Sequence, residues 1–306
     1  MLHNSRFIFF GTPEFASIIL EKLINTGYVP EAVVCNPDKP FGRKKIITPP
    51  PIKQRIMNYE LRIKDKIKIL QPEKLSIIHD SLFKIQPDLF IVAAYAKIIP
   101  KEILEIPRLG TIGVHPSLLP KYRGSSPIQI TILNGDEETG TTLYLMDEGL
   151  DSGPILAQRE LKNYESRIMN YGELHKKLAE LSAELLIETL PKFFNNEITP
   201  QAQDEKQATF TKKFQTEDGY IKFEDLKKAQ EQGNEIALVI DRKIRALNPE
   251  PGVYTLQQIQ GKQKRIKLLE AKITDEKLEL LIVQPEGKKP MPWKNLIKNF
   301  EVPQMK

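Results

Sequence analysis

Cysteine is almost absent from this chain of 306 residues, and Cys35 is the single example. One cysteine excludes an intramolecular disulfide, which is typical of a protein from a reducing compartment. Cys35 follows the apolar run Ala32–Val34, and no histidine lies near it in the sequence. We therefore interpret Cys35 as a buried strand residue, in preference to a catalytic thiol.

Long apolar runs are missing as well. No segment approaches the roughly 20 apolar residues that a membrane-spanning helix needs. The short run Phe7–Phe10 follows Arg6 but stops at Gly11–Glu14, which is too early for the apolar core of a signal peptide. We expect a soluble, cytoplasmic protein that does not bind a membrane.

The glycine pattern of dinucleotide-binding proteins is absent, although the chain offers a place for it. Gly11-Thr12-Pro13 follows an apolar run and precedes residues at helical spacing, as a phosphate-binding turn would. Pro13 and Ala16 stand where the pattern G-x-G-x-x-G requires glycine. We therefore interpret this segment as a structural turn between a strand and a helix.

The first two thirds of the chain lack an excess of either charge. Residues 1–206 contain 26 lysines and arginines and 26 acidic residues, whereas residues 207–306 contain 19 and 14. The whole net charge of +5 therefore lies in the last third. Such an excess indicates a surface that faces phosphate, although a solvated lysine-rich surface would give the same count.

Short apolar runs alternate with helical patterns in the first two thirds. The predicted strands are Arg6–Phe10, Glu31–Cys35, Ile67–Leu70, Asp88–Ala94, Thr111–His115, Thr139–Met146 and Pro154–Leu161, and a long helix is predicted over Tyr171–Leu190. Strands that alternate with helices predict an α/β fold with a doubly wound, mostly parallel sheet. The almost wholly apolar run Asp88–Ala94 suits a central strand covered on both faces.

The pattern changes after residue 195. A polar stretch, Asn195–Ala208, is followed by shorter alternating segments, and strands are predicted over Val253–Ile259, Arg265–Ile273 and Leu278–Val283. These features indicate a small β-barrel or sandwich. We predict an α/β domain over residues 1–203, a linker over 204–210 and a smaller C-terminal β-barrel (OB-like) domain over 211–306.

His115 is the histidine whose position predicts a role. It ends a predicted parallel strand, and ligands of open α/β sheets bind beyond such ends. The acidic loop Asp147–Gly153 follows another strand and can reach the same crevice. A carboxylate beside an imidazole favours the imidazolium, which can stabilise an oxyanion or exchange a proton with an amine. A hairpin loop with solvated acids is the alternative, and no metal site is expected from one histidine.

The segment Pro37–Lys45 is a turn-rich basic loop with one aromatic residue, Phe41. Such a loop can contact phosphates and wedge against bases. Taken alone, it is equally compatible with a solvated loop.

Several segments together resemble a known family. The likeness is carried by Phe10-Gly-Thr-Pro-Glu-Phe15, the loop from Asn36 to Arg43, the segment His115-Pro-Ser-Leu-Leu-Pro-Lys-Tyr-Arg-Gly124, the loop Gly149-Leu-Asp-Ser-Gly153, and Ile244-Arg245-Ala246 in the last third. They resemble the methionyl-tRNA formyltransferase family along the whole chain. The segment that begins at His115 resembles the signature of folate-dependent formyl transfer. The basic loop and the C-terminal domain narrow the resemblance to the formyltransferases that act on tRNA.

The resemblance implies an activity and a site. The activity is transfer of the formyl group of 10-formyltetrahydrofolate to the amino group of initiator methionyl-tRNA, without a metal, and we expect a monomer. His115 would stabilise the oxyanion and move a proton, and Asp151 would orient it. The implied folate-binding residues are Ser117, Leu118, Leu119, Pro120, Asp147 and Gly149, and the implied tRNA-binding residues are Arg43, Lys44 and Lys45.

The chain departs from the family at the reacting centre. The family has an Asn two residues before the His, and here that position is Gly113. A water could fill the space, another donor could replace the amide, or the protein could be slow or inactive. Two alternatives therefore stay open: a folate formyltransferase of another amine, and a tRNA- or folate-binding homologue that has lost catalysis. Ala96, where the family usually has Gly, is a smaller departure.

Overall fold

The structure is a computed structural model that describes residues 6–42, 44–59, 66–162, 164–259 and 262–297. The chain forms two compact units. The first consists of Met1–Pro127, Glu138–Asn163 and Leu174–Thr211, and the second of Ile128–Glu137, Tyr164–Glu173 and Lys212–Lys306. In the part of the chain that the structure describes, no helix is long and apolar enough to cross a membrane.

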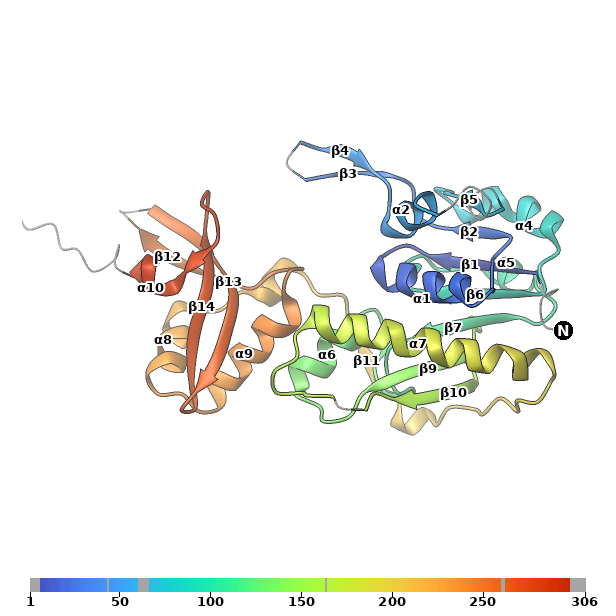
Figure 1. The fold of residues 1–306 in the computed structure, drawn as a ribbon. Coiled ribbons are helices and arrows are strands. Elements are labelled where there is room, and N and C mark those ends of the chain that lie inside the picture. Colours follow the sequence, from blue (N-terminus) through green and yellow to red (C-terminus); the bar gives the residue numbers. More distant parts are fainter. Residues whose placement is uncertain (1–5, 43, 60–65, 163, 260–261, 298–306) are drawn as a thin grey trace, which may run out of the picture. The chain divides into compact units, whose positions relative to one another are not determined.

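A seven-stranded sheet forms the centre of the first unit, in the order β10-β9-β7-β6-β1-β2-β5. Its strands are β1 (Phe7–Gly11), β2 (Ala32–Val34), β5 (Lys68–Leu70), β6 (Leu89–Ala93), β7 (Thr111–His115), β9 (Gly140–Leu145) and β10 (Ile155–Glu160). The five strands from β5 to β7 pair in parallel, and β9 and β10 add an antiparallel edge. The predicted doubly wound, mostly parallel sheet is confirmed (Figure 1).

The order of the strands reverses between β1 and β6. From β1 the chain continues to β2 on one side, and from β6 it continues to β7 on the other. Because the connections leave in opposite directions, the carboxyl ends of these strands border a crevice where ligands of such sheets bind. The carboxyl end of β7, which carries His115, lies next to this point.

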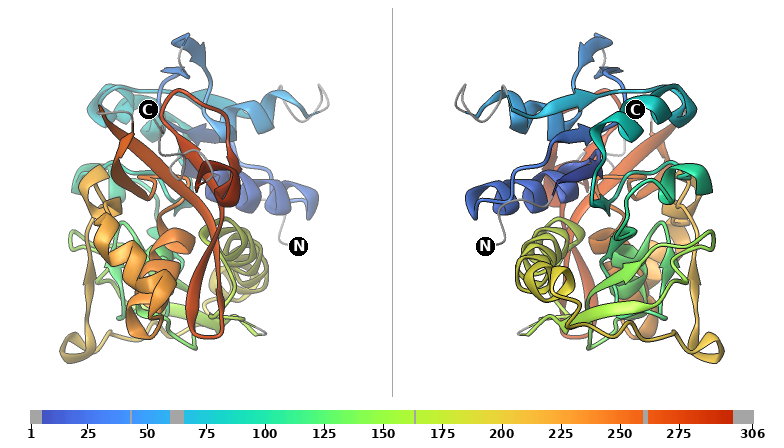
Figure 2. Two further views of the ribbon diagram at one scale, coloured as in Figure 1. Left: turned by 90° about the vertical axis from the view of Figure 1, so that its left-hand side faces the viewer. Right: turned by 90° about the vertical axis from the view of Figure 1, so that its right-hand side faces the viewer.

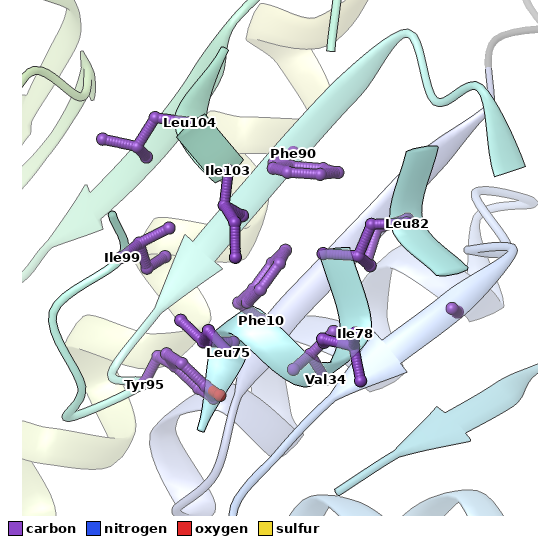
Figure 3. Close-up of a cluster of buried hydrophobic side chains, with 12 residues drawn as sticks. Phe10, Val34, Leu75, Ile78, Leu82, Phe90, Tyr95, Ile99, Ile103 and Leu104 are labelled. Carbon is purple, nitrogen blue, oxygen red and sulfur yellow. The ribbon is translucent and has the colours of Figure 1, made fainter. Parts of the chain in front are cut away.

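Apolar side chains cover both faces of the sheet. On one face, Phe10 of β1 and Phe90 of β6 pack against Leu75 and Leu82 from the short helices η1 (Leu75–Ile78) and α4 (His79–Ile85) (Figure 3). Phe9, which alternates with Phe10 along β1, is also fully buried. Burial on both faces explains why these strands read as continuous apolar runs.

The helices of the first unit are α1 (Glu14–Asn25), α2 (Pro51–Met57), α4, α5 (Lys101–Leu104) and most of α7 (Tyr171–Phe194). The long helix α7 begins at the predicted residue and continues four residues past the predicted end, through Pro191. Leu174, Leu178 and Leu186 of its apolar stripe are fully buried.

Two strand pairs of the first unit were not predicted. A hairpin of β3 (Lys39–Phe41) and β4 (Ile46–Thr48) stands clear of the sheet (Figures 1 and 2). In addition, β11 (Phe210–Thr211) pairs in parallel with β8 (Arg123–Gly124), preceded by the short helix η2 (Glu205–Gln207). Residues 204–210, expected to form a linker, therefore pack against the first unit as ordered structure.

The second unit contains a four-stranded antiparallel sheet in the order β12-β13-β14-β15. Its strands are β12 (Tyr254–Ile259), β13 (Lys262–Thr274), β14 (Lys277–Pro285) and β15 (Met291–Pro292), and its helices are α8 (Phe223–Glu231), α9 (Glu235–Leu247) and α10 (Trp293–Ile297), together with α6 (Pro127–Asn134). The expected smaller C-terminal β domain is confirmed, and it takes the form of this antiparallel sheet. The helices α8 and α9 were not predicted, although Ala237, Ile240 and Ile244 of α9 show helical spacing and are buried.

Candidate active site

His115 is buried at the end of β7, with 6% of its surface exposed. Its Nε2 lies 2.9 Å from the carbonyl oxygen of Tyr122. Because a carbonyl oxygen only accepts, Nε2 carries the proton in the neutral ring. The other nitrogen, Nδ1, faces Asp151 Oδ2 at 3.6 Å. The structure therefore brings together the histidine and the carboxylate that the sequence singled out.

Asp151 is held by two further groups. Its Oδ2 accepts a hydrogen bond of 2.7 Å from the backbone N–H of Gly124, and its Oδ1 accepts one of 2.6 Å from the Tyr144 hydroxyl. The residue has φ of +51°, in the left-handed region that side chains other than glycine rarely adopt. Such a conformation persists when neighbouring contacts hold it, as they do here.

Gly113 lies opposite Tyr144 in the pairing of β7 with β9. A Cβ atom at position 113 would lie 2.4 Å from Cε1 and 2.5 Å from Cζ of the Tyr144 ring. Position 113 therefore has no room for a side chain while Tyr144 keeps its place. Sequence reasoning missed Tyr144, because the register of β7 against β9 decides which residue faces Gly113.

The segment that follows His115 is anchored to β9. The Thr142 hydroxyl donates to the carbonyl oxygen of Ser117 at 2.7 Å and accepts from the backbone N–H of Leu119 at 3.0 Å. The Ser117 hydroxyl donates to the carbonyl oxygen of Lys121 at 2.6 Å, and the side chains of Ser117 and Leu119 are buried. Leu118 and Pro120, the other predicted folate-binding residues of the segment, are partly exposed.

Asp147 forms hydrogen bonds within the acidic loop. Its Oδ1 accepts hydrogen bonds of 3.0 Å from the backbone N–H of Gly149 and from the Ser152 hydroxyl. Gly153, at the end of the loop, cannot be replaced, because a Cβ there would lie 1.7 Å from the carbonyl oxygen of Leu145. The predicted folate-binding residues Asp147 and Gly149 are both exposed on this loop.

A buried arginine links the loop to the segment expected to be a linker. Arg123 is 2% exposed and donates to Gln203 and to both carboxylate oxygens of Glu205. The hydrogen bond to Glu205 raises the pKa of the Arg123 guanidinium. Gln203 in turn donates to the carbonyl oxygens of Asp151 and Gly153 at 2.8 Å and 2.7 Å. Gln203 and Glu205 therefore brace the active-site loop, a role that no local sequence signal indicates.

The predicted tRNA-binding residues lie in the β3–β4 hairpin. Lys44 and Lys45 are exposed in its turn, and Arg43 lies outside the described residues. Phe41 and Ile47 of the same hairpin are 74% and 62% exposed, so apolar side chains accompany the cations. The described part of the hairpin therefore combines exposed cations with exposed apolar side chains.

The hairpin is tied to the sheet at its base. Lys53 of α2 donates to Asp38 Oδ2 at 2.8 Å and to Gln71 at 2.7 Å, while Gln71 donates to the carbonyl oxygen of Asn36. The hydrogen bonds from Lys53 and then Gln71 lower the pKa of the Asp38 carboxyl. This network joins the start of the hairpin to residues that follow β5.

Comparison with known proteins defines the class. Residues 4–190 match the formyl transferase family, and residues 213–279 match the formyl transferase C-terminal domain. The chain belongs to the formyl transferase family, and it is a formyl-transferring enzyme.

Methionyl-tRNA formyltransferases are its relatives within that family. The protein from Enterococcus faecalis is 40% identical over 256 residues, which cover 83% of this chain and 76% of the relative. The protein from Bacillus licheniformis is 38% identical over 288 residues, with 92% and 85% covered.

Solved structures show the same fold at lower identity. The methionyl-tRNA formyltransferase from Clostridium thermocellum is 18% identical with a TM-score of 0.56, and the match covers 92% of this chain and 98% of that one. HypX from Aquifex aeolicus, solved in complex with tetrahydrofolic acid, is 16% identical with a TM-score of 0.61. The match to HypX covers 96% of this chain, which spans about half (47%) of the length of HypX.

Proposed function

We propose that this enzyme transfers the formyl group of 10-formyltetrahydrofolate to the free amino group of initiator methionyl-tRNA. The observation that carries the proposal is the pair of His115, buried at the end of β7, and the partly buried Asp151, with 3.6 Å between Nδ1 and Oδ2. Identity of about 40% to methionyl-tRNA formyltransferases over most of the chain supports the choice of substrates.

The chemistry follows from the site. The amine nitrogen attacks the formyl carbon, and the carbonyl oxygen takes up negative charge in a tetrahedral intermediate. The bond from that carbon to N10 of the folate then breaks, the amine loses a proton and N10 gains one. His115 stabilises the oxyanion and moves the proton, and Asp151 orients the imidazole and balances its charge. No step requires a metal.

The remaining predicted residues take supporting roles in this proposal. Ser117–Pro120, Asp147 and Gly149 line the folate site beside His115. Lys44 and Lys45, with Arg43, contact the acceptor end of the tRNA, and the basic residues after 211 bind its backbone without reading bases. We also propose a cytoplasmic location and a monomer, and sedimentation at the assay concentration would test the monomer.

The first experiment compares formylation of methionyl-tRNA by the unaltered chain, His115→Ala and His79→Ala. His79 is the matched control because its side chain is 41% exposed and it ends no strand of the sheet. We expect His115→Ala to lose on the order of 10²–10³ in kcat, by analogy with loss of one oxyanion donor, and His79→Ala to retain full activity.

Other outcomes identify the alternatives. Binding of methionyl-tRNA and formyl folate without turnover would identify a homologue that has lost catalysis, which Gly113 makes the nearest rival. Turnover with a nucleotide sugar or glycinamide ribonucleotide, without binding of tRNA at low salt, would identify a formyltransferase of another amine.

A further inference from the structure

The space beside Gly113 is filled by the side chain of Tyr144. Measured from the Cβ position that glycine lacks, the ring atoms Cε1 and Cζ lie at 2.4 Å and 2.5 Å, and the hydroxyl oxygen at 2.8 Å. These distances are shorter than any ordinary contact, so neither a side chain nor a water occupies this point. The ring and the hydroxyl of Tyr144 therefore take up the space that a side chain at residue 113 would need.

The hydroxyl of Tyr144 is committed to Asp151. It donates to Oδ1 at 2.6 Å, a short hydrogen bond of the kind formed with a charged acceptor. Tyr144 is only 4% exposed, and burial, followed by the charge of Asp151, raises the pKa of its hydroxyl well above the usual range. The phenol therefore stays protonated at neutral pH and continues to donate.

The two oxygens of Asp151 have separate partners. Oδ1 accepts from Tyr144, whereas Oδ2 accepts from the backbone of Gly124 and faces His115 Nδ1. One hydrogen bond alone would let the carboxylate rotate about its bond to Cβ. The second bond, from Tyr144, stops that rotation and keeps Oδ2 toward the imidazole.

We propose that Tyr144 is a positioning residue for formyl transfer, and that Gly113 and Tyr144 act as a complementary pair. The ring of Tyr144 occupies the space that a side chain at position 113 would need, and its hydroxyl sets the orientation of Asp151, while Gly113 leaves room for the ring. The inference rests on the proposed function, because orientation of Asp151 matters only if His115 performs the chemistry.

The hydroxyl is tested with Tyr144→Phe, which keeps the ring and removes the donor. We expect kcat to fall by about 10-fold to 10²-fold, the effect of losing a hydrogen bond to a charged group. KM for both substrates should stay within about twofold and the melting temperature should be nearly unchanged, because the change acts on the reacting centre. Tyr59→Phe is the matched control, since the buried Tyr59 hydroxyl has no hydrogen-bond partner among the described residues.

The pair is tested with variants at both positions. Gly113→Asn alone should lower the melting temperature and the activity, because its Cβ meets the Tyr144 ring. Tyr144→Leu removes that obstacle, so Gly113→Asn with Tyr144→Leu should fold and be at least about 10-fold more active than Tyr144→Leu alone. Gly113→Leu with Tyr144→Leu is the matched control, because leucine has nearly the size of asparagine but no donor.

The outcomes distinguish the positioning role of Tyr144, its pairing with Gly113 and the proposed function. Full activity of Tyr144→Phe beside an inactive His115→Ala overturns the positioning role and leaves the proposed function intact. A Gly113→Asn variant as stable as the unaltered chain overturns the pairing. If the unaltered chain does not formylate methionyl-tRNA, the proposed function and the positioning role both fail, while the melting temperatures still decide the pairing.

Discussion

The energetic effect of the methyl group of Ala96 depends on the backbone conformation at that residue. Ala96 is exposed in the loop after β6 and has φ of +63°, the left-handed region that favours glycine. From the sequence alone, alanine in place of the family's glycine is a small change in volume. The structure shows that its cost lies in the backbone, because a Cβ is strained at this φ.

We expect Ala96→Gly to raise the free energy of unfolding by about 0.5–1 kcal/mol, since relief of the strained Cβ outweighs the added freedom of the unfolded chain. Thermal or urea denaturation measures the change. Ala208→Gly is the matched control, because Ala208 has φ of −66°, where glycine relieves nothing. That variant should lose about 0.4–1 kcal/mol, and a loss at both positions would contradict the explanation.

At the scale of elements, the segment from Gln203 to Thr211 matters more than its polar composition suggests. Arg123, buried beside it, donates to Gln203 and Glu205, and Gln203 holds the carbonyl oxygens of Asp151 and Gly153. The segment therefore helps to hold the active-site loop in place, although it follows the last helix predicted for the α/β domain. Composition alone does not distinguish a free linker from a segment that a buried arginine holds in place, because both are polar.

We expect Arg123→Met to release residues 203–211 while the sheet stays folded. Amide hydrogen exchange of this segment should increase, and kcat should fall by about 10-fold to 10²-fold because the loop that carries Asp151 loses its brace. Arg159→Met is the control, since Arg159 also pairs with one carboxylate, Glu188, but is partly exposed on β10. If exchange in 203–211 is the same in both variants, Arg123 does not hold the segment.

For the molecule as a whole, four basic residues of the last third lie near one end of the antiparallel sheet. Arg265 and Lys267 are exposed on β13, and Lys288 and Lys289 are exposed in the turn after β14, whose Glu286 N–H donates to the Arg265 carbonyl. On α8, by contrast, Lys227 and Lys228 lie among acidic residues, and Lys228 approaches Asp225 at 4.0 Å. The sheet end is therefore better suited than α8 to contact tRNA phosphates.

Lys288→Ala with Lys289→Ala should weaken binding of tRNA and reduce the slope of log K against log salt by about 2, one for each phosphate that the variant no longer neutralises. Lys227→Ala with Lys228→Ala removes the same charge from α8 and should leave the slope within about 0.5 of the unaltered value. Filter binding over a range of salt concentrations measures both. Equal slopes for the two variants would show that net charge, and not this surface, governs affinity.

Several features could be predicted because their signals are local. Apolar runs such as Asp88–Ala94 indicate buried strands wherever the partners lie, and alternation with helices predicts the parallel sheet. His115 could be predicted as a site residue because the apolar run before it indicates where the strand ends. These signals need no knowledge of which segments meet.

The sequence by itself determined the fold class, a smaller β domain in the last third and the residues His115 and Asp151 as candidates. Only the tertiary structure decided that Tyr144 fills the space beside Gly113 and that Gln203 braces Asp151. The physical reason is the range of the interactions. Apolar periodicity acts between neighbours in the chain, whereas a cross-strand register or a buried hydrogen bond joins residues that the sequence keeps tens of positions apart.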